Sequence, residues 1–326
     1  MHRKLGFAVV VLIELVILAA FIWYLIYLFP PLISNDYQYY GYAPHIPYFD
    51  LYLTSVPVLV IRWFFFLFTA FMVLFMMVTI LGELFRWWVN QGKPQHHVLP
   101  NNAKGERVTR FDNNFRLQHY LIMIFATLAG VIGLAQAFPD VSVGQWFLGS
   151  ILGDLEVKRN FHHYFAYVVD FTVVYFLAYL FYKWAIKKEK LRAMWFTWQD
   201  IKDMMAMNLY ILGLRKAEPS YGRYTFGQKI DFFLIVIGFP ILSLTGLAMH
   251  YTTISEPIIT GMGIALAAVI HRCVALFLFW FVLSVHIYYA HLAPDLFPVN
   301  TVILTGKMGK ARYQALFPLD KERLQN

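Results

Sequence analysis

The sequence predicts an all-α integral membrane protein with six membrane-spanning helices, and two observations carry this prediction. Hydrophobic residues make up 60% of the 326 residues and charged residues 14%, with a mean hydropathy of +0.55. Soluble domains contain roughly 45–50% apolar and about 25% charged residues, so this composition excludes a soluble globular enzyme and a disordered chain. In addition, six apolar stretches each reach the length of about 20 residues that crosses a bilayer.

The six predicted spans lie at 5–29, 56–88, 115–138, 161–184, 230–251 and 263–293. The first follows a basic start at 1–4, but its apolar run is too long for a signal peptide and no small-residue cleavage site follows. We therefore expect a membrane anchor. Between the fourth and fifth spans, residues 195–214 place apolar side chains at helical spacing, which predicts an amphipathic helix at the membrane interface.

Basic residues alternate between the connections and predict the orientation of the chain. The segments at 90–116, 183–229 and after 305 are rich in Lys and Arg, whereas those at 30–55, 139–160 and 252–262 carry far fewer. Cytoplasmic loops carry the excess of Lys and Arg in membrane proteins. We therefore expect both termini in the cytoplasm. This pattern explains the net charge of +8 better than nucleic-acid binding does.

The chain contains one cysteine, Cys273, and 11 histidines. A single cysteine excludes internal disulfides, a cysteine-ligated iron–sulfur cluster within this chain and a C-x-x-C-H haem attachment site. A redox cofactor must therefore be held by histidines or belong to a partner subunit.

Histidines inside the predicted spans are the most informative residues, because ionisable side chains in a membrane are rare and usually functional. His271 and His286 share the sixth span, and fifteen residues of helix rise about 22 Å and rotate about 60° beyond whole turns. Both rings can therefore point into one bundle, one near each membrane face. His291 is rotated to the opposite face and is a poorer ligand candidate.

The predicted topology supplies a partner for each of these two rings. His119 begins the third span near the cytoplasmic face, at the depth of His286. His162 and His163 begin the fourth span near the outer face, at the depth of His271, and His250 ends the fifth span on that side. This depth matching predicts two haems with paired histidine ligands, His119 with His286 and His162 (or His163) with His271.

Two other kinds of histidine site fit the sequence less well, and one alternative function stays open. Membrane di-iron oxygenases need clustered histidine boxes on one side, but the two His-His pairs here are predicted on opposite sides. Ferric-reductase and bc-type cytochromes need two helices that each carry a spaced pair, and only the sixth span does so. The alternative is a haem-free transporter or membrane-anchor subunit whose histidines line a polar path or bond to carbonyl groups.

One helix with two ligands and two helices with one each resembles the cytochrome b (gamma) subunits of membrane-bound formate dehydrogenases, nickel–iron hydrogenases and thiosulfate reductases. RLQH at 116–119 resembles the R-x-x-H that opens the first core helix of this family. GRYTFGQK at 222–229 resembles its G-[KR]-Y-N-x-G-Q-K element, with Thr225 in place of Asn. The sixth span with LTGK at 304–307 resembles its fourth helix and tail, although the His271–His286 spacing is one residue longer.

The resemblance implies a four-helix dihaem cytochrome b domain at 107–326, preceded by two extra transmembrane helices at 1–106. It also implies a set of site residues. The iron of two b haems would be bound by His119, His162, His271 and His286, with His163 and His250 as alternates. Arg116 and Arg272 would pair with haem propionates, unless they only extend to the membrane interface. A quinone, menaquinone or ubiquinone, would bind at Tyr224, Thr225, Gly227 and Gln228, unless this element is only a turn that caps a helix.

The resemblance further implies partners and a location. It places the chain in a prokaryotic cytoplasmic (inner) membrane, where it would pass electrons between the quinone pool and an outer-face redox partner. That partner would be an iron–sulfur or multihaem cytochrome subunit that accompanies a catalytic subunit. Asp170 and Glu14 lie within spans and could relay protons or serve as neutral structural groups.

Overall fold

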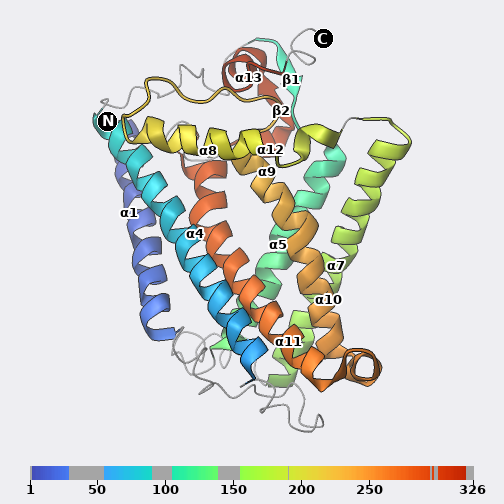
Figure 1. The fold of residues 1–326 in the computed structure, drawn as a ribbon. Coiled ribbons are helices and arrows are strands. Elements are labelled where there is room, and N and C mark those ends of the chain that lie inside the picture. The colour runs from blue at the N-terminus through green and yellow to red at the C-terminus, as the bar shows by residue number, and fades with distance from the viewer. Residues whose placement is uncertain are drawn as a thin grey trace.

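The computed structural model describes residues 2–28, 55–89, 105–138, 155–189, 191–293, 296 and 300–320, and these form a bundle of long helices (Figure 1). Six helical runs are long and apolar enough to cross a membrane: Gly6–Tyr27, Val56–Val89, Asn113–Ala137, Glu156–Ala185, Phe226–His250 and Thr252–Leu292. The predicted all-α membrane fold with six spans is therefore confirmed. Most of the connections predicted at 30–55, 90–116 and 139–160, and the tail after 320, lie outside the described residues.

Several of the spans are continued by short π-helical turns. The spans consist of α1 (His2–Trp23) with η1 (Tyr24–Leu28), α4 (Val56–Val89), α5 (Asn113–Ala137), α7 (Leu155–Ala185), α9 (Phe226–Phe233) with η4 (Leu234–Gly238) and α10 (Phe239–His250), and α11 (Thr252–Phe281) with η5 (Val282–His286) and η6 (Tyr288–Leu292). The elements outside the spans are β1 (Arg107–Thr109), η3 (Leu191–Met194), α8 (Trp198–Ile211), α12 (Val302–Thr305), β2 (Lys307–Gly309) and α13 (Lys310–Leu316).

The last span forms the centre of the bundle. α11 packs against α10 and α4, while α5 packs along α7, and α1 lies against α4 at the edge of the bundle (Figure 1). Buried apolar side chains join α1, α4 and α11, among them Phe21, Met77 and Trp280. Large apolar side chains on other faces, such as Leu12 on α1 and Phe71 on α4, are exposed. An apolar surface of this kind suits a lipid environment.

The last span begins earlier than the sequence predicts. A connection is expected at 252–262, but α11 begins at Thr252 and contains a kink at Thr260, whose φ is 62°. The residues before the kink form a short helical arm that is turned aside from the long part of α11 (Figure 1). Ile254 and Ile258 in this arm are exposed. The polar residues at 252–256 and Pro257 favour a connection in the sequence, but the segment folds as a short helix that ends at the kink.

The amphipathic segment predicted at 195–214 forms α8, which lies across one end of the bundle (Figure 1). The Asp200 carboxylate accepts hydrogen bonds from the backbone N–H and the hydroxyl group of Thr197, and so caps the first turn of α8. The side chains of Trp198 and Met205 are exposed, as an interfacial helix requires. On its other side, Asn208 accepts a 2.9 Å hydrogen bond from Thr79 of α4.

The same end of the bundle carries a small cap, formed by β1 and by residues 300–320 (Figure 1). β1 pairs with β2 in antiparallel register, with Val108 opposite Met308. Met308 packs with Tyr313 and Phe317 in a buried cluster. The backbone N–H groups of Arg110 and Phe111 both donate to the carbonyl oxygen of Gly306, at 2.8 and 3.1 Å. These contacts hold β1 and the residues after it against residues 300–320. We call the end of the bundle that carries this cap the cap end.

Gly306 is the position at which the cap is most sensitive to substitution. Its φ is +73°, and a Cβ on it would lie 2.5 Å from the carbonyl oxygen of Phe111. We predict that Gly306→Ala lowers the free energy of unfolding by about 2 kcal/mol, because a left-handed conformation and a steric conflict both disfavour alanine. Thermal unfolding of the purified protein in detergent measures the effect.

Gly309→Ala is the matched control for this prediction. Gly309 also lies in the cap, but its φ is −60° and nothing lies within 4 Å of an added Cβ. The control should unfold at the wild-type temperature. Equal unfolding temperatures for both variants would show that the Gly306 turn does not hold the cap in place.

Candidate functional site

The first of two histidine pairs lies toward the cap end. His119 on α5 and His286 on η5 have ring centroids 6.2 Å apart. Nδ1 of His286 lies 3.2 Å from a carboxylate oxygen of Asp231, on α9. The carboxylate therefore accepts a hydrogen bond from the ring and fixes its orientation. Nδ1 of His119 is buried and has no hydrogen-bond partner among the described residues.

The second pair lies deeper along the same bundle. His162 on α7 and His271 on α11 have ring centroids 6.3 Å apart. Nδ1 of His162 lies 2.9 Å from the carbonyl oxygen of Ala129 on α5. Nδ1 of His271 lies 3.1 Å from the carbonyl oxygen of Leu242 on α10. Because a carbonyl only accepts, each ring donates through Nδ1, which leaves its Nε2 as the free ligand atom.

These separations suit one iron between the rings of each pair. An imidazole nitrogen binds a first-row transition metal at about 2 Å, and the ring centre lies about 1.2 Å behind that nitrogen. Two imidazoles that share one iron would therefore have ring centres about 6.4 Å apart. The observed 6.2 and 6.3 Å agree with this value. The residues present thus fit haem iron with two histidine ligands.

The two carbonyl groups that orient the second pair share one local arrangement. Gly133 follows Ala129 by four residues on α5, and Gly246 follows Leu242 by four residues on α10. A residue four positions later lies on the same helix face, one turn on. A Cβ on Gly133 would lie 3.2 Å from Cε1 of His162, and one on Gly246 the same distance from Cε1 of His271. Glycine at both positions lets the ring reach the carbonyl of the preceding turn.

A π-helical turn lies between the two ligands of the last span. η5 (Val282–His286) interrupts the α-helix that carries His271 and ends at His286. A π-turn inserts one residue into a helix and is common at functional sites. The His271–His286 spacing is one residue longer than the family resemblance predicts. The π-turn η5 can accommodate that residue, and the ring of His286 still lies opposite His119.

The alternate ligands His163 and His250 form a different contact. Their ring centroids are 4.1 Å apart, which is too close for an iron between them. His250 is exposed, and nearby the hydroxyl groups of Tyr167 and Tyr251 are 3.0 Å apart. His162, not His163, is the ring that faces His271 at ligand spacing.

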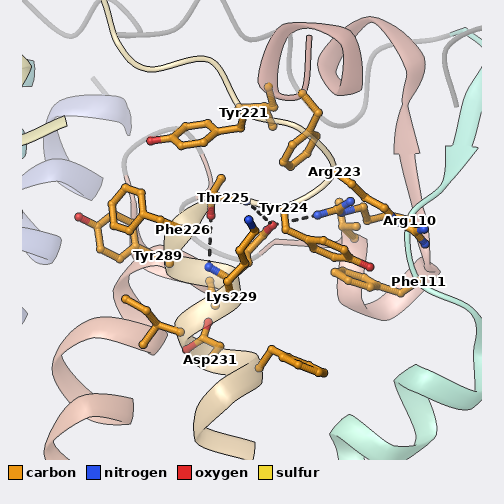
Figure 2. Close-up of a pocket in the computed structure, with 18 of the residues that line it drawn as sticks. Arg110, Phe111, Tyr221, Arg223, Tyr224, Thr225, Phe226, Lys229, Asp231 and Tyr289 are labelled. Atoms are coloured by element: carbon orange, nitrogen blue, oxygen red, sulfur yellow. Dashed lines mark hydrogen bonds between the residues drawn. The ribbon is translucent and has the colours of Figure 1, made fainter. Parts of the chain in front are cut away.

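A cavity of about 670 Å³ opens beside the first pair. His119 and His286 line it, and so do Tyr224, Thr225, Gly227 and Gln228, the residues of the Gly-Gln-Lys element that the sequence singles out. Figure 2 shows this element at the start of α9, with Tyr289 on one side and Arg110 on the other. A cavity of 300–1,000 Å³ lined by apolar and aromatic groups with a few polar ones is typical of small-molecule sites.

The polar side chains of this element bond to one another. Thr225 Oγ1 accepts a 3.2 Å hydrogen bond from the N–H of Gln228, and the Gln228 side chain accepts a 3.3 Å bond from the N–H of Thr225. This reciprocal pair is a capping box that begins α9. The element is thus both a helix cap and a cavity wall. A Cβ on Gly227 meets only Thr225 Oγ1, at 3.9 Å, so an added methyl group makes no close contact there.

Lys229 fastens the element to α8. Its Nζ lies 2.8 Å from Asp200 Oδ1, and both side chains are mostly buried. Burial disfavours the charge of Asp200, but hydrogen bonds from Lys229 and Thr197 outweigh it and hold the pKa of Asp200 below its usual value. The interfacial helix and the cavity wall are therefore held as one unit.

Arg110 is a cavity residue that sequence reasoning missed. Its side chain is buried, donates a 2.9 Å hydrogen bond to Gln228 and lies over the rings of Tyr224 and Phe317, at 4.8 and 4.4 Å (Figure 2). Before the fold is known, Arg110 is one of several basic residues in a loop. Its partners lie more than 100 residues away, so no local signal identifies it.

Arg116 and Arg272, the two arginines that the sequence places beside histidines, lie outside this cavity. Arg116 donates to the backbone carbonyl oxygens of Ile303 and Leu304 and so attaches α5 to the cap. Arg272 is half-buried on α11 directly after His271. Neither lines the cavity that contains His119 and His286.

The carboxyl groups within the spans differ in their surroundings. Asp170 accepts a hydrogen bond from Ser243. Glu14 is fully buried in α1 and has no hydrogen-bond partner among the described residues. Glu83 of α4, which the sequence reading overlooked, lines the cavity. Its position inside an apolar run was a usable signal, because such a carboxyl is rare in a span.

No group of three or more His, Cys, Asp or Glu side chains in the described part of the chain is arranged to hold a bare metal ion. Two-histidine sites instead suit a metal whose other ligands come from a macrocycle.

Comparison with known proteins gives two findings. The family described as prokaryotic cytochrome b561 matches residues 110–297, a range that contains all four facing histidines and excludes α1 and α4. A protein of Haemophilus influenzae, the cytochrome b556 subunit of a formate dehydrogenase, is 27% identical over 190 residues. This similarity covers 56% of the present chain and 71% of that protein.

The glycine at position 133 provides a test of the ring geometry. We predict that Gly133→Leu displaces the His162 ring and removes one of the two haems expected at the histidine pairs, because the added side chain starts 3.2 Å from the ring. Haem content per chain, from the absorbance of the purified protein, measures the loss. Gly130→Leu is the control, since nothing lies within 4 Å of a Cβ there. Equal haem content in both variants would contradict the proposed ring contact.

Proposed function

The chain belongs to the prokaryotic cytochrome b561 family, and we propose that it binds two b-type haems and passes electrons between a redox partner at one membrane face and a quinone at the other. As a member of this family, it is a membrane cytochrome b that serves electron transport as a subunit of an oxidoreductase complex. The haem count, the ligands, the quinone and the partners form the proposal.

One observation carries the proposal. Two histidine pairs have ring separations of 6.2 and 6.3 Å, which is the spacing that a shared iron requires. His119 and His286 would hold one haem, the cap-end haem, and His162 and His271 the other. A bound b haem supplies one-electron redox chemistry. Asp231 and the carbonyl groups of Ala129 and Leu242 orient the ligands, and carboxylate or carbonyl partners of this kind tune a metal site.

The cavity beside the first pair supports a quinone site next to the cap-end haem. Its aromatic and apolar lining suits a quinone ring, and Gly227 leaves space at the start of α9. Gln228 and Arg110 are hydrogen-bonded to each other at 2.9 Å and lie at the wall of this cavity. They can exchange that bond for one to a quinone oxygen. The site would accept menaquinone or ubiquinone.

The relative's name points to the class of partner. Because that protein is a subunit of a formate dehydrogenase, we propose that this chain also anchors a catalytic subunit. An iron–sulfur or multihaem cytochrome subunit at the outer face would connect the two. The pattern of basic loops supports a prokaryotic inner membrane with both termini, and therefore the cap end, in the cytoplasm.

The proposed division of the chain follows from the same match. Residues 107–326 would form the haem-binding domain, and residues 1–106 a two-helix addition. The matched range begins at residue 110 and supports this boundary. α4 packs along α11 and contacts α8, so the added helices are integrated into the bundle.

The proposal predicts two non-covalent b haems per chain, each lost with its own pair of ligands. His119→Ala and His286→Ala should remove the same haem, and His162→Ala and His271→Ala the other, because each pair shares one iron. A pyridine haemochrome assay gives the count, and redox titration identifies which haem is lost.

His163→Ala and His250→Ala serve as controls and should keep both haems, since their rings are 4.1 Å apart and face each other. The haem proposed at His162 and His271 could instead be lost in either control and kept in His162→Ala. That result would show that His163 or His250, and not His162, is the ligand.

The quinone site predicts a separate effect of Gly227→Val. Gly227 lines the cavity and a Cβ on it meets only Thr225 Oγ1, at 3.9 Å, so the haems should remain while the larger side chain stops quinone exchange. Reduction by menadiol should slow strongly, and reduction by dithionite should not change. Gly222→Val is the control, because Gly222 lies in the same element, has open space around it and does not line the cavity. Wild-type menadiol reduction in Gly227→Val would place the quinone elsewhere.

A further inference from the structure

α4 brings a carboxyl group into the cavity from outside the family-matched range. Glu83 lies on α4, and it lines the same cavity as His286 and the Gly-Gln-Lys element. The match to the cytochrome b561 family begins at residue 110. Glu83 is therefore contributed by the two-helix addition and not by the part of the chain that carries the histidines.

Glu83 is held by two tyrosines of the last span. Tyr289 donates a 3.0 Å hydrogen bond to Glu83 Oε1, and Tyr288 donates a 3.3 Å bond to Oε2. Tyr288 is fully buried and packs with Ile80 and Leu84 of α4. Thr79, one turn before Glu83, is bonded to Asn208 of α8. The carboxyl group is thus positioned by three elements, α4, η6 and α8.

Other ionisable groups face the same part of the cavity. Glu218 and Tyr221, in the segment between α8 and α9, lie close enough to Glu83 to interact with it electrostatically. Burial raises the pKa of Tyr221, and nearby acidic groups raise it further. On α4 itself, Arg86 lies 3.8 Å from the ring centre of Tyr210. Polar groups therefore extend from Glu83 toward α8 and the membrane interface.

Besides Glu83 and Glu218, three carboxyl groups line the cavity, and these three have defined structural roles. Asp112 caps α5 and pairs with Lys183 at 3.0 Å. Glu189 lies 3.6 Å from the same lysine, and Asp231 orients His286. Glu83 accepts hydrogen bonds from two tyrosine hydroxyl groups, whereas Asp112 accepts one from Tyr179 and is also ion-paired with Lys183. A hydroxyl group can donate to a carboxylate and can also accept from a protonated carboxyl, so Glu83 keeps its partners in both states.

Quinone chemistry requires such a group, because each two-electron change moves two protons. We propose that Glu83 exchanges these protons with the quinone, an inference that rests on the proposed quinone site. In quinone reduction, a haem held by His119 and His286 would supply the two electrons. For each proton, the O–H bond of Glu83 breaks, an O–H bond forms at a quinone oxygen, and the carboxylate regains a proton from water at the cap end. Quinol oxidation reverses these steps.

The test compares carboxyl variants of the full chain with both haems bound. Glu83→Gln keeps the size and hydrogen bonding of the side chain but cannot exchange a proton. Haem reduction by menadiol should slow on the order of 100-fold in this variant, which is typical for loss of a positioned acid or base. Glu83→Asp should restore part of the rate. Dithionite reduction and haem content should equal those of the wild type.

Infrared difference spectra give a readout that does not depend on the rate. Spectra of the menadione-loaded protein, reduced minus oxidised, should contain a band from a carboxyl group whose protonation changes. Glu83→Gln should lack this band. Glu14→Gln is the matched control, because Glu14 is also a buried carboxyl of the added helices but does not line the cavity. The control should keep both the band and the wild-type rate.

Three outcomes overturn the inference, and they are distinguishable. If menadiol fails to reduce the haems of the wild type, the proposed quinone reaction is wrong and this inference fails with it. If the wild type reacts and Glu83→Gln reacts equally fast with the band retained, only the role of Glu83 is wrong. Should Glu83→Gln not fold, Tyr289→Phe removes the 3.0 Å bond and leaves the carboxyl in place. Its rate should then fall, and a wild-type rate would refute the proposal.

Discussion

The hydrogen bonds that orient the histidine rings are the interaction on which the rest of the structure depends. An imidazole in an apolar bundle is costly unless its N–H finds an acceptor. His162 and His271 find helix carbonyl groups at 2.9 and 3.1 Å, and each of those carbonyls lies one turn before a glycine that gives the ring access.

Once Nδ1 is bonded in this way, Nε2 is the nitrogen left to bind a metal. The same logic applies to His286, where Asp231 at 3.2 Å replaces the carbonyl. The π-turn η5 keeps this ring opposite His119 despite the longer spacing in the last span. The orientation of three rings therefore comes from partners on α5, α9 and α10, while the four facing rings lie on α5, α7, η5 and α11.

The elements around the histidine bundle create the cavity beside the first pair. The cap fixes Arg110, which bonds to Gln228 and lies over Tyr224. α8 fixes Lys229 through Asp200, and α4 adds Glu83. A four-helix cytochrome b core would lack the last of these groups. α4 thus completes one wall of the cavity and does not merely cover the bundle.

Much of this arrangement could be predicted from the sequence. Apolar length and basic loops predict six spans, and the depth of His119, His162, His271 and His286 predicts which rings face each other. The short arm before Thr260 was not predicted, because Thr252, Ser255 and Pro257 are typical of a connection between spans.

Contacts between distant segments could not be predicted either. Arg110 lies in the cavity wall and Arg116 attaches α5 to the cap, and neither of these contacts was expected. Both residues are basic positions near a span end in the sequence, and only the folded cap distinguishes them. The contacts of Glu83 could not be predicted for the same reason, because its tyrosine partners are more than 200 residues away.

An experimental density map of the purified, oxidised chain tests the central claim most directly. The account predicts two planar macrocycles, one between His119 and His286 and one between His162 and His271, each with an imidazole nitrogen on both sides of its iron. A map that contains a single macrocycle, or one whose iron is bound by His163 or His250, would contradict it.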